Sequence, residues 1–371
     1  MTQPRPLRVL HGPVNVGNQP WTLSREERRI GCQSDVVVNY PTWARYRADR
    51  VLGRHGDRSA STIVRRGWFA LSAPWRYDVL HFYFGRSFTC WDDYGSRNPL
   101  WFADLKLARR IGRKVFMTLQ GCDVRLSDRT AEIDPWAPCH LGRCSSAAAC
   151  RASLDRSRRH LIESVLPLAD RVFVLNPDLA RHVPGALFMP YASVDVGTAS
   201  VREPARTEAV TLLHAPSDPT IKGTSLIVEA VERLKRRFPI RFVTVAGLPH
   251  EEAMKQYEQA DLVIDQVLCG WYGGLAVEAM AMGKPVACYV RDDDLRFVPA
   301  AMAAEIPLVR VTPATLEGDL AAALERRQEW PEWGRRSRDY VLRWHDPARI
   351  AASMVRAYLH PDSEFDLDAE R

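Results

Sequence analysis

The stretch Gly270–Pro285 has the composition of a ligand-binding turn followed by a short helix. Ala276–Met282 are good helix formers, Gly283 suits the position after a helix C-terminus, and Pro285 prevents continuation. Helix N-termini expose unpaired N–H groups, which a Ser, Thr, Asp or Asn side chain usually satisfies. The entry to this helix, Tyr272–Leu275 (Tyr-Gly-Gly-Leu), offers no such acceptor. Bare amides approached by glycines suit an anion, typically a phosphate.

One turn into this expected helix, Glu278 supplies a carboxylate that can accept hydrogen bonds from adjacent sugar hydroxyls. Phosphate-binding amides followed by such a carboxylate are the groups that a nucleoside diphosphate and its ribose require. The alternative is a tight glycine turn with a glutamate that the helix dipole favours. This segment by itself leaves both interpretations open.

A second group lies in the stretch 214–224 (His-Ala-Pro-Ser-Asp-Pro-Thr-Ile-Lys-Gly-Thr). Lys222 stands two residues before Thr224, the expected cap of the helix that follows. A cation at a helix N-terminus is unfavourable unless an anion lies there too. An exposed loop lysine is the alternative. Combined with the glycine-led helix entry on a later loop of the same sheet, Lys222 favours an anion site.

An alternation of strands and helices must position these groups. Continuously apolar β-branched runs predict strands that alternate with amphipathic helices, clearest in Thr224–Phe238. The expected strands are 8–11, 35–39, 78–82, 114–119, 171–175, 209–214, 241–246, 261–265, 285–290 and 308–311. This pattern indicates parallel sheets covered on both faces, an α/β fold. We expect two Rossmann-like domains facing each other across a cleft, with ligands at the carboxyl ends of strands.

The pattern pauses at mid-chain, in the polar stretch Tyr191–Glu208, which also lacks periodicity. We therefore expect an acceptor-side domain over 1–190, a linker over 191–208 and a donor-binding domain over 209–345. The segment 346–371 is expected to be a helix that packs back on the first domain, followed by an acidic tail.

Composition and charge narrow the class of protein. The 371 residues are 46% hydrophobic and 26% charged, which is ordinary for a globular chain. No apolar run approaches the ~18 residues of a membrane span, and the N-terminus has no signal-peptide core, so we expect a cytoplasmic protein. Residues 1–190 carry 29 basic against 17 acidic side chains, whereas 191–371 carry 22 against 28. The basic first half suggests an anionic partner, with peripheral contact at the inner membrane face as one expectation.

Eight cysteines occur, and three of them, Cys139, Cys144 and Cys150, lie close together with Cys122 upstream. A structural zinc, a disulfide and plain loop thiols are the alternatives. Their spacings are looser than paired C-x2-C motifs, so no metal site is favoured.

The combination of Lys222-Gly223, Gly273, Glu278 and the run 278–286 (Glu-Ala-Met-Ala-Met-Gly-Lys-Pro-Val) resembles the retaining GT-B glycosyltransferases of family 4 type. The resemblance implies that Lys222 holds the donor diphosphate and Glu278 the nucleotide ribose. The amides of Gly273, Gly274 and Leu275, next to Tyr272, would cradle the phosphates and the transferred sugar. Gly17, on the loop after the first strand, would close from the opposite domain.

Three departures mark a divergent member. The family's additional glutamate, eight positions before Glu278, is Gly270 here. Ser217 stands where an arginine commonly assists the diphosphate lysine, and we include Ser217 among the donor-binding residues. Gln120 replaces a frequent histidine. The glutamate normally helps to position the donor sugar, so its loss bears on sugar recognition.

Two further residues of the first half are candidates for acceptor chemistry. His81, at a strand's carboxyl end, would orient the acceptor or donate to the sugar, unless it is a satisfied core histidine. Asp123 would bind acceptor hydroxyls, unless Gly121-Cys122-Asp123 forms only a turn.

The resulting expectation is a hexosyltransferase-type enzyme that moves a sugar from a nucleotide-diphosphate sugar to a hydroxyl acceptor with retention. It requires no cofactor besides that co-substrate, and the acceptor is anionic or lipid-linked. The alternatives are a nucleotide-sugar epimerase of GT-B shape and a non-catalytic nucleotide-sugar-binding protein. Nucleic-acid binding is disfavoured because no basic module with stacking aromatics is recognisable.

Overall fold

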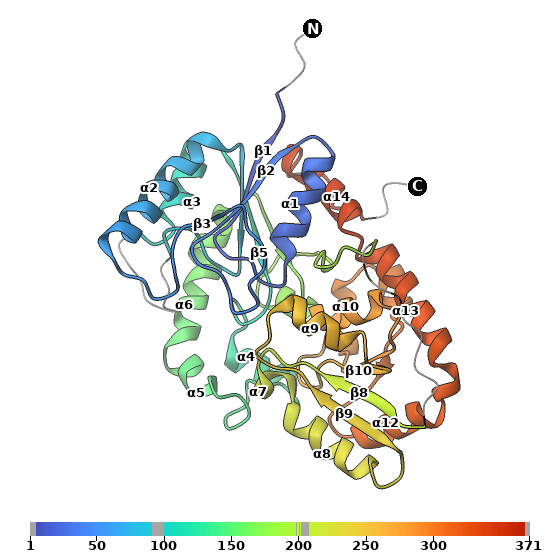
Figure 1. The fold of residues 1–371 in the computed structure, drawn as a ribbon. Coiled ribbons are helices and arrows are strands. Elements are labelled where there is room, and N and C mark those ends of the chain that lie inside the picture. Colours follow the sequence, from blue (N-terminus) through green and yellow to red (C-terminus); the bar gives the residue numbers. More distant parts are fainter. Residues whose placement is uncertain (1–4, 91–99, 198, 200, 202–207, 368–371) are drawn as a thin grey trace. The chain divides into compact units, whose positions relative to one another are not determined.

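A computed structural model describes residues 5–90, 100–197, 199, 201 and 208–367 (Figure 1). The chain forms two compact units. The first contains the described residues of Met1–Leu126, Ser153–Ala192 and Pro347–Arg371, and the second those of Ser127–Ala152 and Ser193–Asp346. Each unit is built on its own parallel sheet. The expected α/β class with two parallel sheets is therefore confirmed.

The sheet of the first unit has the strand order β3-β2-β1-β4-β5-β6-β7. Its strands are β1 Arg8–Gly12, β2 Gln33–Val38, β3 Arg50–Val51, β4 Val79–Tyr83, β5 Lys114–Leu119, β6 Arg171–Val174 and β7 Leu187–Phe188. All neighbours pair in parallel, and His11 of β1 lies in register with His81 of β4. Because the strands are buried on both faces, they are nearly continuous apolar runs.

Helices cover this sheet. They are α1 Gln19–Arg29, α2 Ala60–Arg76, α3 Ala103–Arg110, α6 Asp155–His160 and α14 Pro347–Leu359, with short helical turns at η2 Leu161–Val165, η3 Leu166–Leu168 and η4 Pro177–Arg181. The C-terminal helix α14 lies beside α1, as Figure 1 shows, and Tyr358 on it bonds to the sheet residue His81. The expected return of the C-terminal helix to the first domain is confirmed.

The sheet of the second unit has the order β12-β11-β10-β8-β9. Its strands are β8 Val210–His214, β9 Ile240–Thr244, β10 Leu262–Ile264, β11 Val286–Cys288 and β12 Val309–Arg310. Its helices are α4 Ser127–Ile133, α5 Ala147–Ala149, α7 Pro219–Lys222, α8 Thr224–Leu234, α9 His250–Tyr257, α10 Gly274–Ala281, α11 Ala300–Ala304, α12 Leu316–Glu325 and α13 Trp330–Trp344. The turns are η1 Cys150–Leu154, at the boundary with the first unit, η5 Asp292–Phe297 and η6 Arg327–Glu329.

All ten strands expected from the sequence are present, and β3 and β7 were not foreseen because two residues carry no periodicity. Of the expected linker 191–208, residues 198, 200 and 202–207 lie outside the described residues. The units also differ from the expected ranges 1–190 and 209–345, since Ser127–Ala152 groups with the second sheet. The domain boundaries stay a prediction. Among the described residues, no helix is both long and apolar enough to cross a membrane.

Candidate functional site

The topology of the second sheet singles out one edge. β9 lies on one side of β8 and β10 on the other, so the connections that leave β8 and β9 run in opposite directions. Ligands of open parallel sheets bind outside the carboxyl ends of the strands at such a reversal. The segments that follow β8 and β10 carry Lys222, Gly273 and Glu278. The sheet thus brings three of the expected site residues to one place.

Lys222 is held by a short helix and a glycine. Asp218 caps α7 by accepting hydrogen bonds from the amides of Thr220 (2.9 Å) and Ile221 (3.2 Å). Lys222 is the last residue of α7, where the helix dipole favours a cation. The next residue, Gly223, has φ +78°, and a Cβ there would lie 2.5 Å from Val267. Glycine therefore allows the segment after β8 to approach the segment after β10.

This approach brings Lys222 to a carboxylate that the sequence had not singled out. The Lys222 Nζ lies 3.2 Å from Oδ1 of Asp265, the residue that follows β10, and Asp265 is fully buried. Burial disfavours the charge of Lys222, but the Asp265 carboxylate outweighs this and raises the pKa of the lysine. The expected anion beside Lys222 is thus, in this structure, a side chain of the protein itself.

The same carboxylate caps the helix that carries Glu278. Oδ2 of Asp265 accepts a hydrogen bond from the Gly273 amide at 2.6 Å, at the N-terminus of α10. The expectation of a wholly uncapped entry is therefore wrong for Gly273, because the acceptor comes from eight residues upstream. The amides of Gly274 and Leu275 have no acceptor among the described residues, and both residues are partly exposed. Two helix-terminal N–H groups remain for a ligand.

Glu278 lies inside α10 with only 7% of its side chain exposed. Its Oε1 is 2.6 Å from Nε2 of His250, the first residue of α9. Burial disfavours protonation of His250, but the hydrogen bond to Glu278 outweighs it and raises the histidine pKa above 6.5. Among the described residues, His250 is the one hydrogen-bond partner of this carboxylate. The imidazole of His250 therefore orients the Glu278 carboxylate.

Gly270 explains the glutamate missing from the expected pattern. Its φ is +63°, a conformation that favours glycine, and a Cβ would lie 2.9 Å from the Cβ of Arg291. The Gly270 carbonyl accepts a hydrogen bond from the Arg291 amide at 2.9 Å, which fixes that close approach. A glutamate at 270 is therefore incompatible with this path of the loop.

Two expected details of the donor site change, at Tyr272 and Thr224, and one at Ser217 stays as it was. The Tyr272 side chain is buried and bonds to Tyr340 (2.8 Å) and His345 (2.9 Å), so only its backbone could face a ligand. Thr224 does not cap α8, since Gly223 holds that position and the Thr224 hydroxyl lies 2.8 Å from His214 Nε2. Ser217 is exposed on the loop before α7 and stays a candidate.

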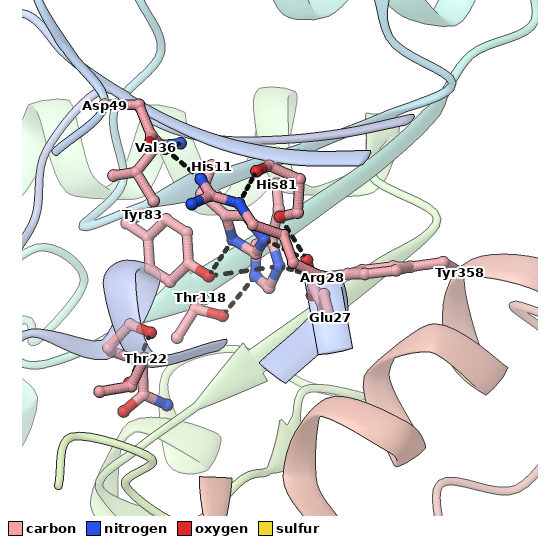
Figure 2. A network of polar contacts seen from close by, with 12 residues as sticks. His11, Thr22, Glu27, Arg28, Val36, Asp49, His81, Tyr83, Thr118 and Tyr358 are labelled. Carbon is pink, nitrogen blue, oxygen red and sulfur yellow. Dashed lines mark hydrogen bonds and ion pairs between the residues drawn. The ribbon is translucent and has the colours of Figure 1, made fainter. Parts of the chain in front are cut away.

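The first unit places His81 in its core. Figure 2 shows His81 among His11, Tyr83, Thr118 and Tyr358, from strands β1, β4 and β5 and helix α14. Its ring nitrogens lie 2.7 Å from the hydroxyls of Tyr358 and Thr118, and it is fully buried. Burial, helped by nearby His11, lowers its pKa well below 6.5. His81 is the satisfied core histidine of the two alternatives, and we do not carry it forward as a catalytic residue.

The carboxylate of Asp123 also has a structural role. Its carboxylate accepts hydrogen bonds from the amides of Gln120 (2.9 Å) and Gly121 (2.7 Å), directly after β5. The side chain is buried, and this burial raises its pKa despite those bonds. These contacts favour the turn over acceptor binding. Gly17 has φ +62° and open space around it on the loop between β1 and α1, so it stays a candidate.

The sequence interpretation missed Asp265 and His250. Asp265 is the last residue of the expected strand 261–265, and His250 lies four positions after the expected strand 241–246, on the side where parallel sheets place ligand-binding groups. That position was the available signal. None of the eight cysteines is joined in a disulfide, and no cluster of metal-ligating side chains is found among the described residues.

No protein-family model matches the chain, and no curated protein matches it in sequence. Solved structures match over nearly its whole length. Sucrose-phosphate synthase from Thermosynechococcus elongatus has a TM-score of 0.59 at 15% identity and covers 96% of this chain and 99% of its own. Anabaena HepE in complex with UDP-glucose scores 0.57 at 10% identity, covering 94% and 98%. A putative UDP-N-acetylglucosamine 2-epimerase from Listeria monocytogenes scores 0.53 at 13% identity, covering 96% and 98%.

At these identities the likeness establishes the fold, not the reaction. The class of fold is α/β with two parallel sheets, as in GT-B proteins, and it extends across the chain.

Proposed function

We propose that the protein is a glycosyltransferase that moves a sugar from a nucleotide-diphosphate sugar to a hydroxyl acceptor, with retention of the anomeric configuration. The observation that carries this proposal is the grouping of Lys222, Glu278 and the α10 amides at the carboxyl edge of the second sheet. These groups match the charges and hydroxyls of a nucleoside diphosphate.

The donor would engage the site through its two polar parts. The diphosphate would bind to the Lys222 ammonium and to the amides of Gly274 and Leu275. Lys222 would then interact with both the diphosphate and Asp265. The ribose hydroxyls would donate to the Glu278 carboxylate, whose Oε1 is oriented by His250. Gly17, on the loop after β1, and Ser217, on the loop after β8, are included as candidate donor-binding residues.

The chemistry would rest on stabilising the departing charge. The bond between the anomeric carbon and the diphosphate oxygen breaks, and its electron pair leaves on the diphosphate beside Lys222. The acceptor oxygen bonds to the same face of the sugar, and its proton passes to a diphosphate oxygen. No strong protein base is needed, because positioning and electrostatic stabilisation supply the rate enhancement.

Binding is tested first. Thermal unfolding with uridine, guanosine and adenosine diphosphate sugars should show a preferential shift for one base, with ~2.7 kcal/mol gained at a hundredfold excess over the dissociation constant. If none of these compounds changes the melting temperature, the proposed site is wrong.

Turnover is tested with Lys222→Ala and Glu278→Ala. Each should lower donor turnover by about a hundredfold or more, since each removes a charged side chain that would contact the donor. Lys235→Ala and Glu232→Ala are matched controls, because these residues form an exposed ion pair on and after α8. Unchanged rates in both site variants would contradict the assignment.

An epimerase is the second candidate, because the fold likeness includes a structure named as a UDP-N-acetylglucosamine 2-epimerase. Nuclear magnetic resonance of the donor sugar, incubated with the protein and no acceptor, separates the two. A new epimer favours this second candidate, and transfer only with a hydroxyl acceptor favours the first. Donor binding without either reaction would indicate a non-catalytic binding protein.

A further inference from the structure

Helix α2 of the first unit carries large apolar side chains in solvent. Val64 is 69% exposed, Trp68 71%, Leu71 48% and Trp75 61%. Single exposed apolar residues are common in proteins, but four on one helix, two of them tryptophans, need a physical reason. We call Val64, Trp68, Leu71 and Trp75 the α2 stripe.

The α2 stripe occupies one face. At about 100° per residue, positions 64, 68, 71 and 75 fall within ~60° of one another around the helix axis. The opposite face holds Phe69, Ala70 and Ala73, which pack into the core of the first unit. The helix is therefore anchored by its inner face and presents a second apolar face outward.

The charged side chains of α2 are of one sign. α2 contains Arg65, Arg66 and Arg76 and no acidic residue. Over 45–76 the chain has eight arginines against two aspartates. Both aspartates are paired with residues of the first unit, since Asp49 forms an ion pair with Arg28 and Asp57 accepts a hydrogen bond from the Thr62 hydroxyl at 2.7 Å. Arg66 is buried, so Arg65 and Arg76 are the two exposed charged side chains of α2 beside the stripe, and both are basic.

Charge complementarity indicates which partner the α2 stripe contacts. A second copy of the chain would bring the same arginines against these, and like charges oppose such a self-paired interface. An anionic lipid surface attracts them instead, at ~1 kcal/mol per basic side chain near it. Tryptophans on an apolar helix face with arginines beside them are typical of helices that lie in the membrane interface.

We propose that α2 is a membrane-docking helix, which inserts Trp68 and Trp75 into the interface of an anionic bilayer while the flanking arginines contact lipid phosphates. Arg65 is held next to the helix by its bonds to the Leu52 carbonyl and the Thr62 hydroxyl. Arg76 lies at the C-terminal end of α2. This docking is independent of the reaction at the second sheet.

The test is co-sedimentation of the full chain with vesicles of phosphatidylcholine, with and without phosphatidylglycerol. The wild-type protein should bind only the anionic vesicles and be released at about 1 M salt, where the Debye length is ~3 Å. Trp68→Ser/Trp75→Ser should lower the partition coefficient at least about tenfold, because the apolar contact is lost. Arg65→Glu/Arg76→Glu should lower it at low salt only.

Matched controls lie on other helices. Leu342→Ser/Leu359→Ser removes exposed leucines of α13 and α14, and Arg335→Glu reverses an exposed charge of α13; both should bind as the wild type does. Circular dichroism and thermal unfolding of every variant verify folding. Equal binding to neutral vesicles, equal binding of the Trp68/Trp75 variant, or no binding at all would overturn the proposal. So would a wild-type dimer that this variant converts to monomer.

Discussion

Asp265 is the residue whose role changes the view of the candidate site most. Its two oxygens bind the Lys222 ammonium (3.2 Å) and the Gly273 amide (2.6 Å), which are two of the groups expected to bind an anion. A buried carboxylate in that position orients both groups, but it also repels a second anion. In the proposed donor site, Asp265 would therefore set how strongly a phosphate is attracted.

We predict that Asp265→Asn binds nucleoside diphosphate about tenfold more tightly, a gain of ~1.4 kcal/mol, because repulsion is relieved and Lys222 loses its competing partner. The variant without ligand should unfold more easily, by about 3 kcal/mol, since the buried ion pair is broken. Thermal unfolding with and without uridine diphosphate measures both effects.

Asp261→Asn is the control for this variant. Asp261 is similarly buried and accepts a hydrogen bond from the Thr211 amide, but it precedes β10 instead of following it. Diphosphate affinity should be unchanged there. A weaker affinity in Asp265→Asn would mean that orienting Lys222 matters more than repulsion.

At the scale of elements, the position of α10 depends on how its C-terminus meets α13. The helix ends in a Schellman motif, with the Gly283 amide bonded to Met280 (2.9 Å) and the Lys284 amide to Ala279 (3.0 Å). Gly334 of α13 packs against this turn so closely that a Cβ would lie 2.0 Å from the Gly283 carbonyl oxygen. Backbone contact between these elements leaves no room for a side chain.

Gly334→Ala should therefore destabilise the protein by about 1–3 kcal/mol, because the backbone of one helix must move. Gly318→Ala in α12 is the matched control, since a Cβ there meets nothing within 4 Å. It should stabilise by about 0.5–1 kcal/mol through helix propensity alone. Urea unfolding of both variants measures the difference, and equal free energies would contradict the close contact.

At the scale of the whole molecule, the two units should respond to pH in opposite directions. The pKa of His81 is lowered in the folded first unit, so acidification below about pH 6.5 protonates the unfolded chain first and costs stability, at up to ~1.4 kcal/mol per pH unit. The pKa of His250 is raised, through Glu278 and more weakly Glu251. Its contribution is complete below about pH 6.5 and is lost as the pH rises through the raised value.

Unfolding free energies measured between about pH 5 and pH 8 test both signs. His81→Phe should flatten the acid side of the profile, whereas the gap between the wild type and His250→Gln should shrink with rising pH. A steeper acid slope in His81→Phe would contradict the neutral, buried histidine.

Periodicity and turn chemistry in the sequence determined the alternation of strands and helices, ten of the strands, and the positions of Lys222 and Glu278 after strand ends. These are local properties, because apolar pattern, glycine and proline act within a few residues. Only the tertiary structure decided which distant residues pair. Asp265 lies beside Lys222 because β8 and β10 are neighbours in the sheet, although the two residues are 43 positions apart in the sequence.

The same reason separates the outcomes for His81 and Gly270. A histidine at a strand end can belong to a functional site or to the core. His81 lies in the core because it is hydrogen-bonded to Tyr358, 277 positions further along the chain. An absent glutamate at Gly270 could be noted in the sequence, but its cause, a positive φ and the Cβ of Arg291 close to it, exists only in the folded chain. Local composition selects the elements, and long-range packing selects which of their side chains meet.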